Sequence, residues 1–408
     1  MIRRKITNKL LAALSDSPVV LLHGARQTGK STLIKSLVGE EYPAEYLTFD
    51  DPGILSAAQN NPIEFLSAYE GSIALDEVQR VPGIFPTIKS LVDKKRKPGK
   101  YILTGSSNVL LIPKISESLA GRMEILNLFP FSQNEITGSD SNFIDDVFGK
   151  NYKLPKVPEK QNELIKRVIT GGYPEMLSRK NKERQDAWFK SYVTTILQRD
   201  VRDIANIEKL SELPKLLKLF ASRAGTLLNF AEFSRSSAIP QTTLKRYTAL
   251  LEAIFMIYLL PAWSGNLSKR LIKTPKLYLS DTGLLSHLTG FDSETRKTDA
   301  LLWGRVLENF VLMELVKQAS WGDFNLSLFH FRTSGGQEVD FVIERSDGSL
   351  VGIEVKSTSQ VDAGMFNHMK VFAEETGKKF LRGVVFYTGE KAIPFAKNMY
   401  ALPVDVLW

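Results

Sequence analysis

The sequence predicts an α/β protein of several domains, and three observations lead to this prediction. Over residues 1–135, short apolar runs alternate with helical stretches, which is the pattern of a parallel sheet covered by helices. Helical stretches dominate the middle of the chain, and the last third returns to strands behind a long amphipathic helix. The chain has 408 residues, enough for about two to four domains.

The composition is that of an ordinary globular protein, with 43% hydrophobic and 24% charged residues. The formal net charge of +8 mildly favours an acidic partner such as nucleic acid or a membrane surface. The absence of Cys excludes disulfides, thiolate metal sites and a Cys nucleophile. Polar residues and Pro18 interrupt the first apolar stretch, and the later run AIFMIYLLPAW is too short to span a bilayer. We therefore expect a soluble, cytoplasmic protein without a membrane partner.

The stretch VVLLHGARQTGKST joins an apolar strand to a glycine-bounded loop and the start of a helix. Its spacing Gly24-x-x-x-x-Gly29-Lys30-Ser31 is the phosphate-binding P-loop pattern. In such a loop, backbone N–H groups and the positive end of the helix surround the phosphates. The lysine reaches the β- and γ-oxygens, and the serine hydroxyl is a ligand of Mg²⁺. The residues expected to bind the nucleotide are Gly24, Ala25, Arg26, Gln27, Thr28, Gly29, Lys30, Ser31 and Thr32.

A second signal is SIALDEVQR, an apolar strand that ends in Asp76 and Glu77. We expect this strand to lie beside the P-loop strand, where Asp76 can hold Mg²⁺ through water. Glu77 can then orient and polarise the attacking water. The second acid distinguishes a hydrolase from a protein that only binds nucleotide. Glu77 and Lys30 are therefore predicted to be catalytic, and Arg122 and Lys356 are further catalytic candidates.

Further strands are expected within residues 44–51, 100–108 and 123–132, which completes an open α/β sheet. If the strand within 100–108 is central, Thr104 and Asn108 at its polar tip lie near the γ-phosphate and can sense it. Arg122 immediately precedes the last strand. It is a candidate arginine finger acting on a neighbouring subunit, and a plain surface arginine is the equal alternative.

The motifs GARQTGKST, IALDEVQR, ILTGSSN and SLAGRMEILNLFPFS resemble those of AAA-type ATPases of bacteria and archaea with an uncharacterised, nuclease-like C-terminal domain. The later stretches GGYPE, QRDV, YLSDTGLL and RGVVFYTGE match the same pattern, so the resemblance covers nearly the whole chain. It implies an AAA-type P-loop ATPase core over residues 1–135, with ATP binding and hydrolysis. It does not supply a cellular role.

Residues 136–215 are expected to form a helical lid, because ELIKRVITGGYPEML and RQDAWFKSYVTTILQRDVRDI have helical apolar spacing. Arg199 lies on the second helix and could approach the nucleotide. A salt bridge to Asp200 or Asp203 is the more ordinary role for this arginine.

Residues 216–292 predict a winged helix, since a helix-turn-helix pattern around Ile239 is followed by a hairpin. The start of the second helix is the part that enters a major groove in such folds, and basic wing residues suit phosphate contacts. Packing within the protein or against a subunit is the alternative use of this pattern. The candidate DNA-contacting residues are Thr242, Thr243, Lys245 and Arg246 on the helix, and Lys269, Arg270, Lys273 and Lys276 on the hairpin.

Residues 293–408 are expected to form a C-terminal α/β domain with a helix bearing Glu308 and three strands bearing Asp340, Glu354 and Lys356. Charges on apolar strands need partners or a metal. Glu308, Asp340 and Glu354 could hold Mg²⁺ or Mn²⁺, with Lys356 polarising a water. This order is similar to the PD-(D/E)xK nuclease superfamily, and RTSGGQEVDFVI looks like junction-resolving nucleases of archaea. A structural ion pair between Glu354 and Lys356 is the alternative, and no glutamine-bearing exonuclease helix follows Lys356.

The favoured function is Mg²⁺-dependent ATP hydrolysis coupled to action on DNA, by a chain that could form homo-oligomers. The alternative is an ATP-operated switch or scaffold that binds a protein partner and has a catalytically silent nuclease-like domain.

Overall fold

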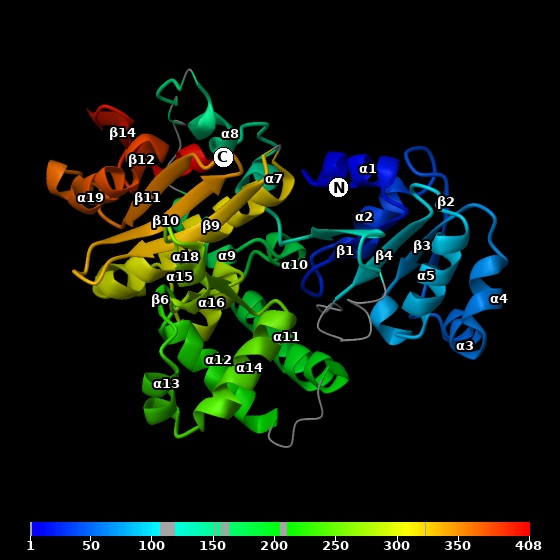
Figure 1. Cartoon of the computed structure of the whole chain (residues 1–408). Coiled ribbons are helices and arrows are strands. Elements are labelled where there is room, and N and C mark those ends of the chain that lie inside the picture. Colours follow the sequence, from blue (N-terminus) through cyan, green and yellow to red (C-terminus); the bar gives the residue numbers. More distant parts are fainter. Residues whose placement is uncertain are drawn as a thin grey trace.

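The computed structural model describes residues 2–106, 119–150, 152–155, 157, 163–204, 210–322 and 324–408. Within these residues, the strands form sheets of five, six and three members. Figure 1 shows the five-stranded amino-terminal sheet and its helices, blue to cyan, on one side of the molecule. The green helices and the orange strands of the large C-terminal sheet lie on the other side.

The amino-terminal sheet has the strand order β2-β3-β4-β1-β5, and all its strand pairs are parallel. The expectation that the strand ending in Asp76 lies beside the P-loop strand was wrong. The P-loop strand pairs with β4 and β5, and β4 separates it from β3. The strand bearing Thr104, β4, is the central strand of this sheet, which is the condition under which Thr104 was expected near the γ-phosphate. The strands are β1 (Val19–His23), β2 (Ala44–Thr48), β3 (Ser72–Asp76), β4 (Tyr101–Gly105) and β5 (Met123–Asn127).

Helices cover both faces of this sheet because β1 is apolar at nearly every position. Val19 and Leu21 point to one face and pack with α3, α4 and α5, whereas Val20 and Leu22 pack with α1 and α2 on the other. The turn η1 follows β3. The bounds are α1 (Thr7–Asp16), α2 (Lys30–Leu37), α3 (Pro52–Asn60), α4 (Pro62–Ser67), η1 (Val78–Arg80) and α5 (Ile84–Lys94).

The expected helices of the lid are present, but their core is shared with the rest of the chain. One buried cluster joins side chains from Phe143 to Leu407 and also includes Ala25 of the P-loop. The boundaries expected near residues 215 and 292 therefore do not separate independent cores. The helices after β5 are α7 (Gln133–Thr137), α8 (Phe143–Phe148), α9 (Leu164–Thr170), α10 (Pro174–Ser178) and α11 (Lys182–Ile204).

The middle of the chain contains two helices joined by a short turn and a small antiparallel sheet of order β6-β8-β7. Ala238 ends the first helix in a left-handed conformation, with φ of 58°. The elements are η3 (Leu210–Glu212), α12 (Leu213–Ser222), β6 (Thr226–Leu227), α13 (Phe230–Ser237), α14 (Gln241–Ala253), β7 (Ile257–Leu260), α15 (Leu267–Ile272), β8 (Lys276–Leu279) and α16 (Thr282–Thr289).

The C-terminal sheet has the order β13-β14-β12-β11-β10-β9, with α18 packed on one face and α19 on the other. The three strands expected around the turns at Gly336 and Gly348 are confirmed as an antiparallel set. The elements are α17 (Thr295–Thr298), α18 (Ala300–Trp321), β9 (Leu326–Arg332), β10 (Glu338–Arg345), β11 (Leu350–Lys356), η4 (Ala363–Phe366), α19 (Asn367–Thr376), η5 (Gly377–Lys379), β12 (Phe380–Tyr387), β13 (Ile393–Ala396), β14 (Met399–Pro403) and η6 (Val404–Leu407).

The middle sheet is fastened to the C-terminal sheet by backbone hydrogen bonds. The N–H of Trp263, just after β7, donates to the carbonyl of His330 on β9 at 2.6 Å. The N–H of His330 donates in return to the carbonyl of Pro261 at 2.9 Å. The hairpin expected to be a projecting wing is therefore anchored along one of its strands.

Candidate functional site

The P-loop connects the carboxyl end of β1 to the amino end of α2. A side chain at Gly24 would come within 2.2 Å of the carbonyl oxygen of Leu128, and Gly29 has a left-handed φ of 94°. Both positions therefore need glycine. The Nζ of Lys30 is buried and donates to the carbonyls of Gly24, at 2.9 Å, and Ala25, at 2.8 Å. The lysine is thus held over the loop that its sequence pattern assigned to phosphate.

Asp76 lies beside this loop although its strand is not adjacent to β1. Its Oδ1 accepts a hydrogen bond from the hydroxyl of Ser31 at 3.0 Å and a short one from the hydroxyl of Thr104. Its Oδ2 accepts from the hydroxyl of Tyr46 at 2.6 Å. The carboxyl ends of β3 and β4 thus bring the predicted residues together at the mouth of the P-loop.

Glu77 is positioned by the end of β4. Its backbone is left-handed, with φ of 61°, and its N–H donates to the hydroxyl of Thr104 at 3.1 Å. Gln79 donates to the Glu77 carboxylate and, at 3.0 Å, to the hydroxyl of Ser106. Ser106 also donates to Glu77 Oε2 at 3.3 Å. Thr104 therefore links the two acids, which fits its predicted place near the γ-phosphate, and Asn108 lies outside the described residues.

Tyr46 and Gln79 were missed by the sequence reasoning. Gln79 is two residues beyond Glu77, so its proximity to that acid was available as a signal. Tyr46 lies on a different strand, 30 residues before Asp76, and no local pattern connects the two. Burial, and secondarily the bond to Asp76, raises the pKa of the Tyr46 phenol, so it stays a hydrogen-bond donor.

Two segments outside the sheet contact the P-loop, and a third contacts the residue before it. The buried guanidinium of Arg4 donates to the carbonyl of Thr28 at 2.7 Å. The hydroxyl of Tyr192 on α11 donates to the carbonyl of Arg26 at 3.3 Å. The ring of Phe255 packs edge-on against His23, the last residue of β1 before the loop, with centroids 5.3 Å apart. Burial, assisted by the charge of Lys30, lowers the pKa of His23 to about 4, so this ring is neutral.

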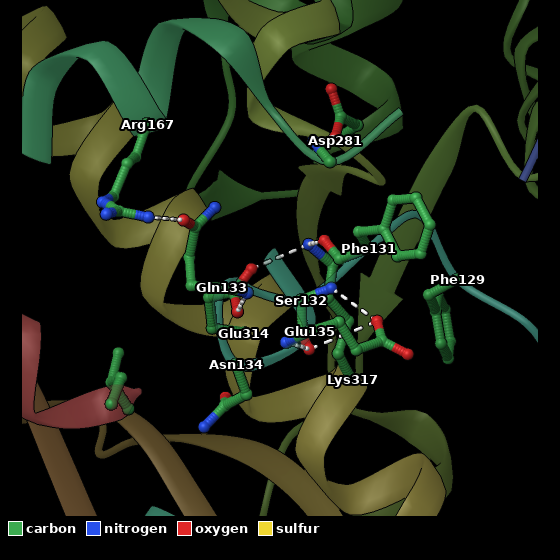
Figure 2. Close-up of polar contacts among 12 residues, drawn as sticks. Phe129, Phe131, Ser132, Gln133, Asn134, Glu135, Arg167, Asp281, Glu314 and Lys317 are labelled. Atoms are coloured by element: carbon green, nitrogen blue, oxygen red, sulfur yellow. Dashed lines mark hydrogen bonds and ion pairs between the residues drawn. The ribbon is translucent and has the colours of Figure 1, made fainter. Parts of the chain in front are cut away.

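Arg4 also begins a buried polar joint between the amino-terminal sheet and α18. It donates to Glu135 at 2.9 Å and to the carbonyl of Phe129 at 2.7 Å. Figure 2 shows the rest of this joint, in which the backbone N–H of Gln133 donates to Glu314 of α18 at 2.7 Å.

Lys317 completes the joint from α18. Its Nζ donates to the carbonyl of Phe131 at 3.0 Å and to Glu314 at 2.8 Å (Figure 2). Arg167 of α9 contacts the side chain of Gln133 at 2.9 Å. The segment after β5 is therefore fixed by charged groups of helices far along the chain.

Arg122 lies at the amino ends of the strands, and the P-loop lies at their carboxyl ends. It precedes the first residue of β5, which pairs with Val19 at the start of β1. Its guanidinium forms an ion pair with Asp93 of α5, with an Nη2–Oδ2 distance of 3.0 Å. It is therefore far from its own chain's P-loop, and only a neighbouring chain could receive it as a finger. The side chain of Arg199 lies outside what the structure describes.

Asp340 and Glu354, two of the C-terminal carboxylates named from the sequence, lie on neighbouring strands. Phe341 pairs with Ile353, which places Asp340 across from Glu354 on neighbouring strands. The Oδ2 of Asp340 accepts the N–H of Val355 at 2.9 Å, and Lys356 pairs with Glu354 at 2.8 Å. Within the described residues, no group of three or more acidic or histidine side chains is arranged to hold a metal ion. The predicted metal site therefore stays a prediction.

Lys276 of β8 reaches into this cluster from the middle sheet. Only 2% of its side chain is exposed, and its Nζ lies 3.2 Å from Glu308, 2.5 Å from Glu338 and 3.6 Å from Asp340. Burial alone would lower the pKa of Lys276, but the three carboxylates outweigh it and raise the pKa. Burial raises the pKa of Glu308 to about 7, and Lys276 opposes this shift. The expectation that Lys276 contacts phosphate from the wing was wrong, because its ammonium is buried among these acids.

The other predicted DNA-contacting residues fall into two groups. Arg270 forms an ion pair with Glu344, with an Nη2–Oε1 distance of 3.0 Å, and its guanidinium stacks over Trp263. Thr242, Lys245 and Arg246 are exposed on α14, Thr243 is half-buried there, and Lys273 is exposed before β8. The side chain of Lys269 lies outside the described residues. The basic surface is therefore smaller than the sequence suggested.

Comparisons with known proteins match three successive parts of the chain. Residues 16–137 match the family described as "AAA domain". Residues 161–295 match "Domain of unknown function (DUF8612)", and residues 303–407 match "Domain of unknown function (DUF4143)". An uncharacterised protein of Mycobacterium tuberculosis is 30% identical over 404 residues, covering 99% of this chain and 84% of its own. The chain belongs to the family of this protein.

The family also includes an uncharacterised protein of Mycobacterium bovis with the same identity and coverage. The solved structure of a Walker-type ATPase of Pyrococcus abyssi is 17% identical and covers 71% of this chain and 96% of its own, with a TM-score of 0.45. The match to the AAA domain supports ATP binding and hydrolysis by the amino-terminal domain. In the part of the chain that the structure describes, no helix combines the length and apolar character needed to cross a membrane.

Proposed function

We propose that this family member couples Mg²⁺-dependent ATP hydrolysis to the binding of DNA by its middle domain. The observation that carries the proposal is the hydrogen-bonded set formed by Ser31, Asp76, Thr104 and Glu77 at the mouth of the P-loop. Lys30 lies at the loop itself. A phosphate-binding loop, a metal-binding acid and a second acid are the parts that hydrolysis of a phosphoanhydride requires.

Ser31 and Asp76 are suited to hold hydrated Mg²⁺, because both supply oxygen atoms and these atoms lie 3.0 Å apart beside the P-loop. The bound ion would neutralise charge on the phosphate oxygens. Lys30 would release the carbonyls of Gly24 and Ala25 to bind the β- and γ-phosphates. Glu77 would orient the attacking water, and Thr104, bonded to the Asp76 carboxylate and to the backbone N–H of Glu77, would sense the γ-phosphate.

The α13–α14 pair supports a winged helix that contacts DNA. α13, the turn at Ala238 and α14 are followed by the β7–β8 hairpin, and this order is that of helix-turn-helix folds. The amino-terminal part of α14 exposes Thr242 and Lys245. Lys273 is exposed between α15 and β8, the hairpin's second strand. Arg270 and Lys276 are excluded from phosphate contact by their carboxylate partners, so the interface we propose rests on α14.

The test is ATPase activity of the full chain with and without duplex DNA, single-stranded DNA and RNA. We expect duplex DNA to stimulate hydrolysis and to bind more weakly as salt rises, because phosphate contacts release counterions. The variant Lys245→Ala/Lys273→Ala should keep basal hydrolysis and lose the stimulation. The matched control Lys95→Ala/Lys97→Ala removes two exposed lysines of the ATPase domain and should behave as the wild type.

The second candidate is an ATP-operated switch that binds a protein partner and has a silent nuclease-like domain. The position of Lys276 among the carboxylates favours this candidate, because its ammonium forms ion pairs with carboxylates that a nuclease would need as metal ligands. Unchanged hydrolysis with every nucleic acid, together with no binding at low salt, would reject the DNA proposal and leave the switch as the better account.

A further inference from the structure

A lysine occupies the place that the C-terminal carboxylates would offer to a metal ion. Lys276 does not belong to the C-terminal domain but to β8 of the middle sheet. Its buried ammonium faces Glu308 of α18 and both Glu338 and Asp340 of β10. Buried lysines are rare unless paired, and three carboxylates around one amine satisfy that requirement.

The oxygens that would bind a divalent ion already have partners. Glu308 Oε1 accepts from Lys276 at 3.2 Å and from the hydroxyl of Tyr278 at 2.6 Å. Asp340 Oδ1 lies 3.6 Å from the Nζ of Lys276, and Asp340 Oδ2 accepts a hydrogen bond from the N–H of Val355 at 2.9 Å.

The remaining two carboxylates are also engaged by cations. Arg332 pairs with Glu338 at 3.3 Å, and Lys356 pairs with Glu354 Oε2 at 2.8 Å. Glu354 Oε1 is the buried oxygen of the cluster without a hydrogen-bond partner among the described residues. A divalent ion would thus meet carboxylates that are already paired with cations, and a fixed positive charge, which repels it.

The backbone holds Lys276 in this position. Lys276 pairs with Leu260 of β7 and with Leu227 of β6, so its strand is central in the middle sheet. β7 continues into the backbone bonds between Trp263, Pro261 and His330 that fasten it to the C-terminal sheet. His330 also contacts the carbonyl of Thr274, two residues before Lys276, at 3.1 Å. Because Lys276 lies on a central strand and not on an exposed loop, a loop movement cannot carry its ammonium away from the carboxylates.

We propose that Lys276 is the resident cation of the C-terminal carboxylate cluster, and that it excludes divalent metal ions and joins the middle sheet to the C-terminal domain. The PD-(D/E)xK-like arrangement of Glu308, Asp340 and Glu354 is then an ionic joint. This inference does not depend on the ATPase reaction or on DNA binding, so its failure and theirs are separate results.

The experiment is a titration of the nucleotide-free full-length chain with Mn²⁺, with bound ion counted by electron paramagnetic resonance. Wild type is expected to bind no Mn²⁺ that depends on Asp340. Lys276→Met keeps the length of the side chain and removes its charge, and it should gain one bound Mn²⁺ per chain. The added substitution Asp340→Asn should abolish this gain. Lys273→Met, which removes an exposed lysine three residues away, should match wild type.

Two results would overturn the proposal. One is a Mn²⁺ ion bound by wild type and lost in Asp340→Asn, since the metal would then displace or tolerate Lys276. The other is a folded Lys276→Met chain that gains no ion. If Lys276→Met does not fold, the same titration is done with Lys276→Met/Glu338→Gln, in which one of the carboxylates left without a cation is also neutralised. The wild-type titration tests the proposal independently of both variants.

Discussion

At the scale of single residues, the ATPase site depends on a few oxygens arranged around Asp76. Ser31, Tyr46 and Thr104 all donate to its carboxylate, so this acid is held in place from three different elements. Glu77 is held by its own N–H and by Gln79. The two neighbouring acids therefore have separate supports, which is what separate roles in metal binding and water activation require.

The separate roles predict different outcomes for Lys30 and Glu77. Lys30→Ala should abolish tight ATP binding, because the charge that meets the β- and γ-phosphates is lost. Glu77→Gln should bind ATP normally and slow turnover by orders of magnitude, because the attacking water loses its base. Equilibrium binding of a fluorescent ATP analogue and steady-state phosphate release measure the two effects. Wild-type turnover in Glu77→Gln would exclude this role for the glutamate.

At the scale of elements, the amino-terminal segment before α1 connects the P-loop to the segment after β5. Arg4 bonds to the carbonyls of Thr28 and Phe129 and to Glu135, which is the N3 residue of the capping box on α7. The α7 segment in turn contacts α18 through Glu314 and Lys317. A single buried side chain therefore connects the nucleotide-binding loop to elements that pack with the C-terminal sheet.

The replacement of Arg4 by Ala should destabilise the fold strongly. It leaves Glu135 buried without its cationic partner and frees two carbonyls, which costs about 3–5 kcal/mol for a broken buried pair. Thermal and urea unfolding of full-length protein measure the loss. Arg3→Ala removes the neighbouring exposed arginine and should change stability by less than about 0.5 kcal/mol. Equal unfolding curves for the two variants would contradict the structural role of Arg4.

At the scale of the whole molecule, the chain is an ATPase domain attached to a larger body whose main core runs from Phe143 to Leu407, with a second cluster under α19. The main core includes Ala25 of the P-loop. Tyr192 of α11 contacts the carbonyl of Arg26 in the same loop, and Phe255, between α14 and β7, contacts His23 just before it. The larger body therefore abuts the nucleotide loop on one side. Arg122 lies at the amino ends of the strands, where only another chain could use it.

If Arg122 acts on a neighbouring subunit, Arg122→Ala should bind ATP normally and hydrolyse it poorly. Wild-type activity per subunit should rise with protein concentration, because the finger is absent from the monomer. Arg96→Ala, an exposed arginine after α5, is the matched control and should keep wild-type activity. Activity per subunit that stays constant across dilution of a confirmed monomer would rule out a finger in trans.

The sequence alone predicted the P-loop, the acids Asp76 and Glu77 and the ordered carboxylates of the C-terminal domain. These features are contiguous in the chain or follow the periods of strands and helices, so local spacing is sufficient to find them. Glu338 was within reach of the same reasoning, because it lies two residues before Asp340 on one strand.

Only the tertiary structure decided the remaining contacts. It placed β4 between β1 and β3, brought Tyr46 to Asp76, joined Arg4 to Thr28 and buried Lys276 among acids from two other elements. In the sequence, Lys276 looks like one more basic residue of a wing. Its position follows from packing between segments more than 30 residues apart along the chain, as with Glu308 at 32 residues. A buried charge is stable only with partners, and these partners are distant in the sequence, so local spacing cannot predict them.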